Sequence, residues 1–237
     1  MLPILWIHGF PLSSAMFEPQ THIAGYRHLC PDLRGFGSAP PPDSDMSMAS
    51  YARDLLASID ADRFVLAGFS MGGYIAMELL RQVPERIAAL LLLDTRETPD
   101  TDEGRAKRYE QAEDVAKNGT RNVIDAMLPK MVAQESYRAD VRRIMETASP
   151  QGVIAALKAM ATRPDSSGTL RNATMPAFVI CGDRDEITPM RDAERMASLL
   201  PHAELAPIAR AAHMANFEAH EQVNNLIAAF LGRALRT

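Results

Sequence analysis

The feature that most restricts the fold is a regular alternation of short apolar runs with amphipathic stretches. The apolar runs, each the length of one strand, are residues 2–8, 27–30, 64–67, 87–93, 177–181 and 203–206. Several are apolar throughout, as is typical of parallel strands covered on both faces. Helical patterns lie between them at residues 48–59, 71–82, 191–200 and 221–231. This order predicts an α/β fold with a mostly parallel, doubly covered sheet.

The alternation stops between residues 95 and 174. This segment has no strand-like run and instead holds four helical patterns, over residues 105–117, 121–131, 139–147 and 152–161. Insertions of this length are uncommon unless they serve a function. We therefore expect residues 1–94 and 175–237 to form the α/β core. Residues 95–174 should form a helical cap, or lid, above the edge where the strands end and where chemistry gathers in such sheets.

The composition is that of a chain able to bury a large apolar core. Hydrophobic residues make up 47% of its 237 residues, which is enough for one large domain without disulfides or metals. The net charge is −5, with acidic and basic residues interspersed and no long basic run. Because nucleic-acid binding needs clustered Lys and Arg, we do not expect a nucleic-acid partner.

Cysteine usage and the N-terminus both favour a cytoplasmic protein. The two cysteines, Cys30 and Cys181, each end a strand-like run, where a buried thiol behaves as a small apolar group in a reducing compartment. The apolar N-terminus lacks a basic flank and runs at once into His8, so we interpret it as a strand and not as a signal peptide. No apolar run approaches the roughly 18 residues of a membrane-spanning helix.

The sharpest local signal is the pentapeptide Gly68-Phe69-Ser70-Met71-Gly72, which matches G-x-S-x-G. In this motif the serine occupies a strained turn between a strand and a helix, and its neighbours two positions away must be small. The alternative is a structural glycine turn. A strand-like run before the motif and a helical pattern after it favour Ser70 as a nucleophile, with the helix N-terminus beneath its hydroxyl.

A serine nucleophile needs a general base, and His213 is the best candidate. It follows the last apolar run and precedes the C-terminal helical pattern, which places it on the same sheet edge as Ser70. A histidine that merely caps the helix is the alternative. At His8 we expect the backbone to matter more than the ring. The remaining histidines lie in polar or loop contexts: His22, His28, His202 and His220.

The acid that orients the base should come from a third strand end. Asp183 and Asp185 both follow the run at residues 177–181, and Asp94 follows the run at residues 87–93. Spacing alone does not choose among the three. The chain order of Ser, Asp and His is the order found in α/β hydrolases.

Taken together, the motifs resemble the α/β-hydrolase-fold superfamily, close to small carboxylesterases and 3-oxoadipate enol-lactonase-like hydrolases. The resemblance rests on four segments: His8-Gly9-Phe10-Pro11, residues 32–38, the serine turn, and Gly182-x-x-Asp185-x-x-x-Pro189 followed by His213. It implies that Asp185 is the acid, that the backbone N–H groups of Phe10 and Met71 form an oxyanion hole, and that residues 32–38 are a structural loop. Two departures are Ala212, where many relatives have Gly, and a sheet that lacks the first two of the usual eight strands.

These features predict a serine hydrolase that cleaves small carboxylic esters or lactones through an acyl-enzyme, with no metal or organic cofactor. Carbon–carbon bond hydrolases, thioesterases and cofactor-free perhydrolases of the same fold are the alternatives, and a non-catalytic small-molecule receptor is a remote one. Apolar side chains of the cap should mostly form its own core. Met127 and Met131 are our candidates for contacts with the substrate.

Overall fold

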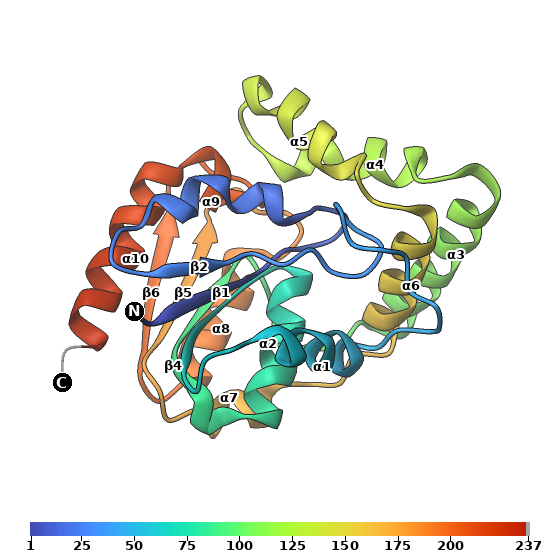
Figure 1. Cartoon of the computed structure of the whole chain (residues 1–237). Helices are drawn as coiled ribbons and strands as arrows, with labels where there is room; N and C mark the ends of the chain where they lie inside the picture. Colours follow the sequence, from blue (N-terminus) through green and yellow to red (C-terminus); the bar gives the residue numbers. More distant parts are fainter. Residues whose placement is uncertain (236–237) are drawn as a thin grey trace.

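The computed structural model describes residues 1–235 as a parallel sheet with helices on both faces (Figure 1). Its six strands pair in the order β2-β1-β3-β4-β5-β6, and every pairing is parallel. The strands are β1 (Pro3–Ile7), β2 (Arg27–Leu29), β3 (Phe64–Phe69), β4 (Ile87–Leu93), β5 (Ala177–Gly182) and β6 (Ala203–Ile208). The predicted fold class is confirmed, and each predicted apolar run forms a strand.

The strand order reverses between β1 and β3, because the chain moves outward from β1 to β2 and then returns to the other side of β1. Such a reversal opens a crevice beyond the carboxyl ends of the two central strands. The loop after β1 contains His8, Gly9 and Phe10, and the turn after β3 contains Ser70. The topology therefore brings these two segments together.

Each face of the sheet packs on its own apolar core. On one face, side chains such as Leu66 and Leu90 pack with helices α1 (Met48–Ser58), α2 (Met71–Gln82), α7 (Ser167–Arg171) and α8 (Met190–Leu199). On the other, side chains such as Trp6 and Leu91 pack with the 3₁₀ helix η1 (Ser14–His22), α9 (Ala215–Glu218) and α10 (His220–Ala234). A short 3₁₀ turn, η2 (Pro84–Arg86), leads into β4.

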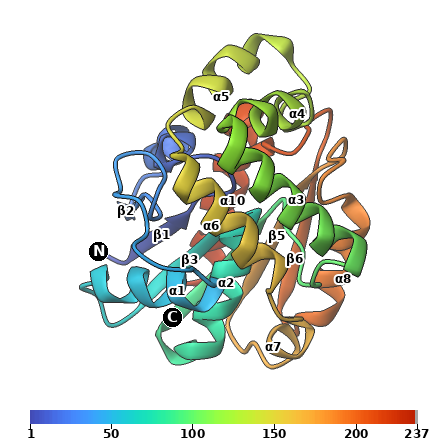
Figure 2. The ribbon, with the colours of Figure 1, turned by 90° about the vertical axis from the view of Figure 1, so that its right-hand side faces the viewer.

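The segment between β4 and β5 is helical, as predicted. It contains α3 (Asp102–Asn118), α4 (Arg121–Met131), the 3₁₀ turn η3 (Glu135–Tyr137), α5 (Arg138–Met145) and α6 (Pro150–Ala161). These helices gather at one end of the sheet in Figure 1 and face the viewer in Figure 2. Apolar residues of α3 and α6, with Val123 of α4, join the core on the α2 side. The other buried apolar residues of α4 and those of α5 join the core on the α10 side.

Helix α6 is fixed to the loop after β2 by a close approach of backbones. The N–H and the hydroxyl of Ser149, which caps α6, both donate to the carbonyl of Gly35, at 2.8 and 3.0 Å. A side chain on Gly152 would collide with the Gly35 backbone, and Gly35 itself has φ +86°. Glycine at both positions therefore permits this contact.

Two further observations concern disulfide bonds and membrane-spanning helices. Cys30 and Cys181 are both free thiols, and three strands separate β2 from β5 in the sheet. Within residues 1–235, no helix is both long and apolar enough to span a bilayer.

Candidate active site

Ser70 occupies the strained turn between β3 and α2. Its φ of +52° and ψ of −116° lie in a region that non-glycine residues rarely adopt. Three hydrogen bonds hold this conformation: Ser70 N–H donates to Leu93 O at 3.0 Å, and Ser70 O accepts from Gly73 N–H at 2.9 Å and from the Thr95 hydroxyl at 2.7 Å. A side chain on Gly72 would collide with the backbone at the end of β1. The turn therefore packs against the neighbouring strand only because that position is glycine.

His213 lies directly beside the Ser70 hydroxyl. Its Nε2 is 2.9 Å from Ser70 Oγ, and its Nδ1 is 2.8 Å from Asp185 Oδ2. The imidazole is completely buried, while Ser70 is 7% exposed. If Nδ1 carries the proton that Asp185 accepts, Nε2 is left as an acceptor for the serine hydroxyl. The structure thus brings Ser70 and His213 together with Asp185, the acid that the family resemblance implied.

Asp185 is held by donors on both of its oxygens. Oδ1 accepts from the N–H groups of Ile187 and Thr188 at 2.7 and 3.0 Å, and Oδ2 accepts from the Thr188 hydroxyl at 2.7 Å. Burial opposes ionisation of this carboxyl, but the charge of His213 and the hydrogen bonds from His213 and Thr188 outweigh it, so the pKa of Asp185 is lowered. An ionised Asp185 is the state that can orient and stabilise the imidazole.

The other two candidate acids lie elsewhere. Asp183 is exposed and accepts the Arg210 N–H at 2.7 Å. Asp94 is fully buried, with Oδ1 accepting the Gly182 N–H at 2.8 Å and Oδ2 without a partner among the described residues. Burial, reinforced by the nearby Asp185 charge, raises the pKa of Asp94 well above its ordinary value. Burial therefore favours the neutral form of Asp94, whereas the surroundings of Asp185 favour its ionised form.

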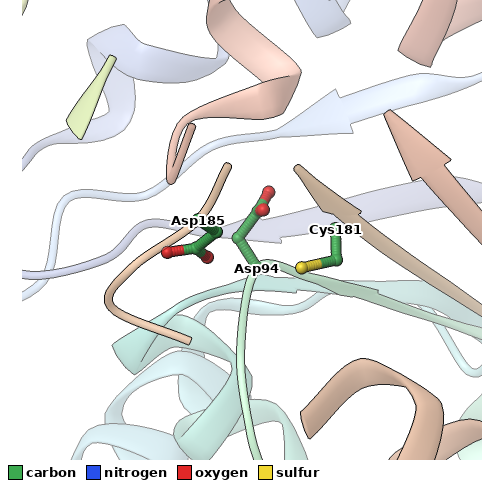
Figure 3. A group of neighbouring side chains, drawn as sticks. All are labelled: Asp94, Cys181 and Asp185. Carbon is green, nitrogen blue, oxygen red and sulfur yellow. The ribbon is translucent and has the colours of Figure 1, made fainter. Parts of the chain in front are cut away.

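Asp94, Asp185 and Cys181 each bring one donor atom within 4.8 Å of the others (Figure 3). Burial and the adjacent carboxylates raise the pKa of the Cys181 thiol, as they do the pKa of Asp94. A metal ion needs deprotonated ligands, whereas this group favours a protonated thiol and a protonated carboxyl. The two carboxyl groups already have partners in the protein, since Asp185 is bonded to His213 and Thr188 and Asp94 accepts the Gly182 N–H. A buried thiol with a raised pKa is not an activated nucleophile.

The two segments that carry the predicted oxyanion donors both adjoin Ser70. Met71 is the first residue of α2, so its N–H has no preceding helical carbonyl to serve as its acceptor. Phe10 follows Gly9, and a Cβ built on Gly9 would be 3.0 Å from the Cβ of Ser70. The loop after β1 is therefore in van der Waals contact with the serine.

Three residues support the site in ways that the sequence did not reveal. The His8 ring matters more than we expected, since it is completely buried, accepts the Leu33 N–H on Nε2 at 3.0 Å and lies 3.0 Å from Gly9 O through Nδ1. The second is Thr188, which donates to Asp185 as described above. The third supporting residue is Glu218, whose side chain is nearly buried.

The Glu218 carboxylate connects the helical insertion to the loop that carries His213. It accepts the N–H groups of Ala133 and Gln134, at 2.9 and 3.2 Å, and also the N–H of Ala212. A backbone hydrogen bond from Met214 N–H to Met131 O, at 2.7 Å, lies beside it. Both neighbours of His213 in the chain are thus bonded into this junction. Glu218 lies on the short helix α9, which has too few residues for a periodic signal.

The two candidate substrate contacts occupy different surroundings. Met127 is half-buried and lines a cavity of about 270 Å³ together with Ile187, two residues from Asp185. Met131 is completely buried in the apolar core on the α10 side. Among the described residues, Met127 lines this cavity and Met131 does not.

A comparison with known families agrees with this geometry. The sequence model of the Alpha/beta hydrolase family matches residues 4–226. The chain belongs to this family. The resemblance inferred from the sequence motifs is therefore confirmed, and the chain is a member of a family of hydrolases.

Known relatives include esterases and a lactonase. A thermophilic esterase from Thermogutta terrifontis, solved with malate bound, is 34% identical, covers 99% of this chain and 90% of its own, and has a TM-score of 0.95. The enol-lactonase of Burkholderia xenovorans LB400 shares the fold at 22% identity, with 98% and 92% covered and a TM-score of 0.89. A pimeloyl-[acyl-carrier protein] methyl ester esterase of Legionella pneumophila is 28% identical over 90% of this chain and 88% of its own.

Proposed function

We propose that this hydrolase cleaves small carboxylic esters or lactones, with Ser70 as nucleophile, His213 as general base and Asp185 as the acid that orients it. The observation that carries the proposal is the continuous path of contacts from Ser70 Oγ to His213 Nε2 at 2.9 Å and from His213 Nδ1 to Asp185 Oδ2 at 2.8 Å. These separations are those of hydrogen bonds through which a serine proton can be transferred.

The reaction would proceed in two steps through an acyl-enzyme. His213 Nε2 takes the Ser70 proton as Oγ attacks the ester carbonyl, and the N–H groups of Phe10 and Met71 stabilise the negative charge that develops on the carbonyl oxygen. The imidazolium is stabilised by Asp185 and returns its proton to the departing alcohol. In the second step His213 takes a proton from water as the water oxygen attacks the acyl group. His213 then returns this proton to Ser70 Oγ as the bond to the acyl group breaks and the acid is released.

The nature of the relatives supports an ester as the bond cleaved. The Thermogutta terrifontis protein, 34% identical over nearly the whole chain, is an esterase. A lactone is an internal ester and requires the same proton transfers. We further propose that residues 95–174 act as a lid, since the hydrogen bonds of Glu218 and Met214 join this segment to the His213 loop.

Replacing Ser70 with Ala tests the proposal. With the attacking oxygen removed, kcat on a short p-nitrophenyl ester should fall by about 10³-fold to 10⁶-fold, while the circular dichroism spectrum is unchanged. A fluorophosphonate should label the wild type at one site and the variant at none. Ser198→Ala, at an exposed serine on α8, is the matched control and should behave as the wild type. Near-normal turnover by Ser70→Ala would refute the assignment. Separately, a substrate panel that includes thioesters and compounds with a cleavable carbon–carbon bond, measured on the wild type, would identify the bond cleaved.

A further inference from the structure

We propose that Thr95 is a positioning residue for the reaction, because its hydroxyl fixes the peptide unit that carries the Met71 N–H, one of the two oxyanion donors. The inference rests on the proposed function, since it assigns a role at the same site. Thr95 lies two residues after the end of β4 and is 1% exposed. Its hydroxyl donates to the Ser70 carbonyl oxygen at 2.7 Å. The contact is therefore with the backbone of the nucleophile and not with its hydroxyl.

The Ser70 carbonyl and the Met71 N–H belong to the same peptide unit. This unit is planar, and because the bond is trans its carbonyl oxygen and its N–H point in opposite directions. A donor that holds the Ser70 oxygen on one side therefore sets the direction of the Met71 N–H on the other. Hydrogen bonding at a carbonyl also polarises the amide, which strengthens its N–H as a donor. Thr95 can thus act on the oxyanion site without touching the substrate.

The serine turn does not secure the orientation of this peptide unit by itself. The ψ angle of Ser70 sets the direction of its carbonyl, and its values of φ +52° and ψ −116° lie in a region that persists only where the surroundings hold it. The carbonyl oxygen accepts from two donors, the Gly73 N–H at 2.9 Å and the Thr95 hydroxyl. Gly73 belongs to the turn and moves with it, whereas Thr95 is a fixed point outside the turn.

Thr95 is fixed through its neighbour Asp94, which is bonded to β5. The Asp94 N–H donates to Ile180 O at 2.9 Å, and Asp94 Oδ1 accepts the Gly182 N–H at 2.8 Å. Asp94 has a φ of +43°, so its conformation also depends on these bonds. The Asp94–Thr95 pair therefore connects the end of β5, which leads into the Asp185 loop, to the serine turn after β3.

The glycine that directly follows the G-x-S-x-G motif makes room for this contact. A Cβ built on Gly73 would collide with the Thr95 side chain, with Oγ1 as the nearest atom. Any side chain at this position would therefore push the Thr95 hydroxyl away from the Ser70 carbonyl. Gly73 is the residue type that lets Thr95 reach the turn.

The variant Thr95→Val tests the proposal, because it replaces the hydroxyl with a methyl group of similar size. On a short p-nitrophenyl ester, kcat should fall by about tenfold to 100-fold. KM should stay within about twofold, since the Met71 N–H stabilises a charge that develops only in the transition state. Thr95→Ser keeps the donor and should restore kcat to within about threefold of the wild type. A normal kcat for Thr95→Val would refute the proposal.

Thr21→Val is the matched control. Thr21 is an exposed threonine of η1 whose hydroxyl also donates to a backbone carbonyl, Glu18 O at 2.7 Å, and its variant should behave as the wild type. Circular dichroism checks that each variant is folded. If Thr95→Val does not fold, Thr95→Ala removes the same donor without adding bulk and should show the same loss of kcat.

A pair of ketone inhibitors separates positioning from structural support. In a trifluoromethyl ketone, Ser70 Oγ bonds to the carbonyl carbon, the serine proton passes to His213, and the carbonyl oxygen becomes an oxyanion. The Ki of this inhibitor for Thr95→Val should rise by about the same factor as kcat falls, because both depend on the oxyanion donors. The Ki of the matching methyl ketone, bound without an adduct, should not change. An equal rise for both ketones would mean that Thr95 only supports the pocket.

The Met71 amide can also be observed directly, without any substrate. In protein labelled with ¹⁵N-methionine, its NMR signal, assigned from Met71→Leu, should shift in Thr95→Val and keep its place in Thr95→Ser. If the wild type cleaves no ester or lactone but the trifluoromethyl ketone binds more weakly to Thr95→Val, the proposed function fails and the role of Thr95 stands. If Ser70→Ala abolishes ester cleavage but Thr95→Val changes neither kcat nor the Met71 signal, the proposed function stands and the role of Thr95 is wrong.

Discussion

Asp185 and Asp94 are neighbouring buried carboxyl groups whose pKa values are shifted in opposite directions. Asp185→Asn removes the acceptor that fixes the His213 tautomer, and kcat should fall by about 10⁴-fold. Asp94→Asn replaces a carboxyl group whose neutral form is favoured by burial with a neutral amide of the same shape that can still accept the Gly182 N–H, so kcat should stay within about threefold. The exposed Asp183→Asn is the control and should have no effect. Steady-state kinetics on one ester measures kcat for all three variants. A decrease in kcat for Asp94→Asn as large as that for Asp185→Asn would contradict our choice of acid.

His8 should make stability depend on pH. Burial lowers the pKa of its ring from 6.5 to about 4, so between these values the unfolded chain binds a proton that the folded chain does not. The free energy of unfolding should therefore decrease as the pH falls through this window, by about 3 kcal/mol in total. Asp94, with its raised pKa, acts in the opposite sense, because its contribution is lost as the pH rises.

Urea unfolding of the Asp94→Asn variant at pH 7 and pH 5 measures the pH dependence of the free energy of unfolding without the opposing contribution of Asp94, and this free energy should be lower at pH 5. NMR titration of the ring provides the direct check, since its signals should not move between these two values. An NMR titration midpoint near the ordinary histidine pKa of 6.5 would show that the fold does not hold the ring neutral.

At the residue scale, the sequence alone selected candidate site residues wherever a residue is tied to a local motif. Ser70 and His213 follow strand ends, and G-x-S-x-G has a backbone reason for its glycines. Spacing could not choose among Asp94, Asp183 and Asp185, because the choice depends on which carboxylate reaches the His213 ring. Glu218 escaped for the same reason, since its role comes from contacts between segments far apart in the chain. Thr188 lies only three residues from Asp185, and no motif that we used marked its hydroxyl as a donor.

At the scale of elements, Glu218 on α9 joins the segment after α4 to the His213 loop. Glu218→Gln would replace one of the two accepting carboxylate oxygens with an NH₂ group. That NH₂ group would face backbone N–H donors and could not accept from them. We expect the free energy of unfolding to fall by about 2 kcal/mol and kcat by about tenfold, because Ala212 and Met214 flank His213. Glu221→Gln, exposed in the first turn of α10, should change neither. Chemical denaturation and ester kinetics test this, and a variant with normal kcat would mean that the junction does not position His213.

The elements that the sequence predicted are those with enough length to show a period. All six strands and the eight longer helical patterns were found within a few residues of their observed bounds, and α2 at Met71–Gln82 matches the predicted range. The elements η1, η2, η3, α7 and α9 were missed. η1 contains Pro19 and holds its place through Phe17, whose ring lies 5.2 Å from that of Trp6. Short elements of this kind are stabilised by tertiary packing and not by their own propensity.

At the scale of the whole molecule, the helical insertion has no apolar core separate from the sheet. Val153, Ala156 and Leu157 of α6 pack in the core on the α2 side, whereas Val141 and Met145 of α5 pack in the core on the α10 side. We had expected the apolar side chains of the cap to form mostly a core of its own. That expectation is wrong, because the inner faces of these helices are shared with the sheet.

This shared packing predicts that the insertion does not unfold as one unit. Eight residues of α6 are buried, and its N-terminus is bonded to Gly35, so the amides of α6 should exchange with the same free energy of opening as those of β3 and β4. Helix α5 buries only Val141 and Met145 and lies at the outer end of the molecule in Figure 1, so it should exchange through a smaller opening. Native-state hydrogen exchange with increasing urea, read by mass spectrometry of peptides from each helix, measures both energies, with β4 as the internal reference. Exchange of α6 together with α5, well before β4, would mean that the cap opens as an independent body and that the two cores are not cooperative.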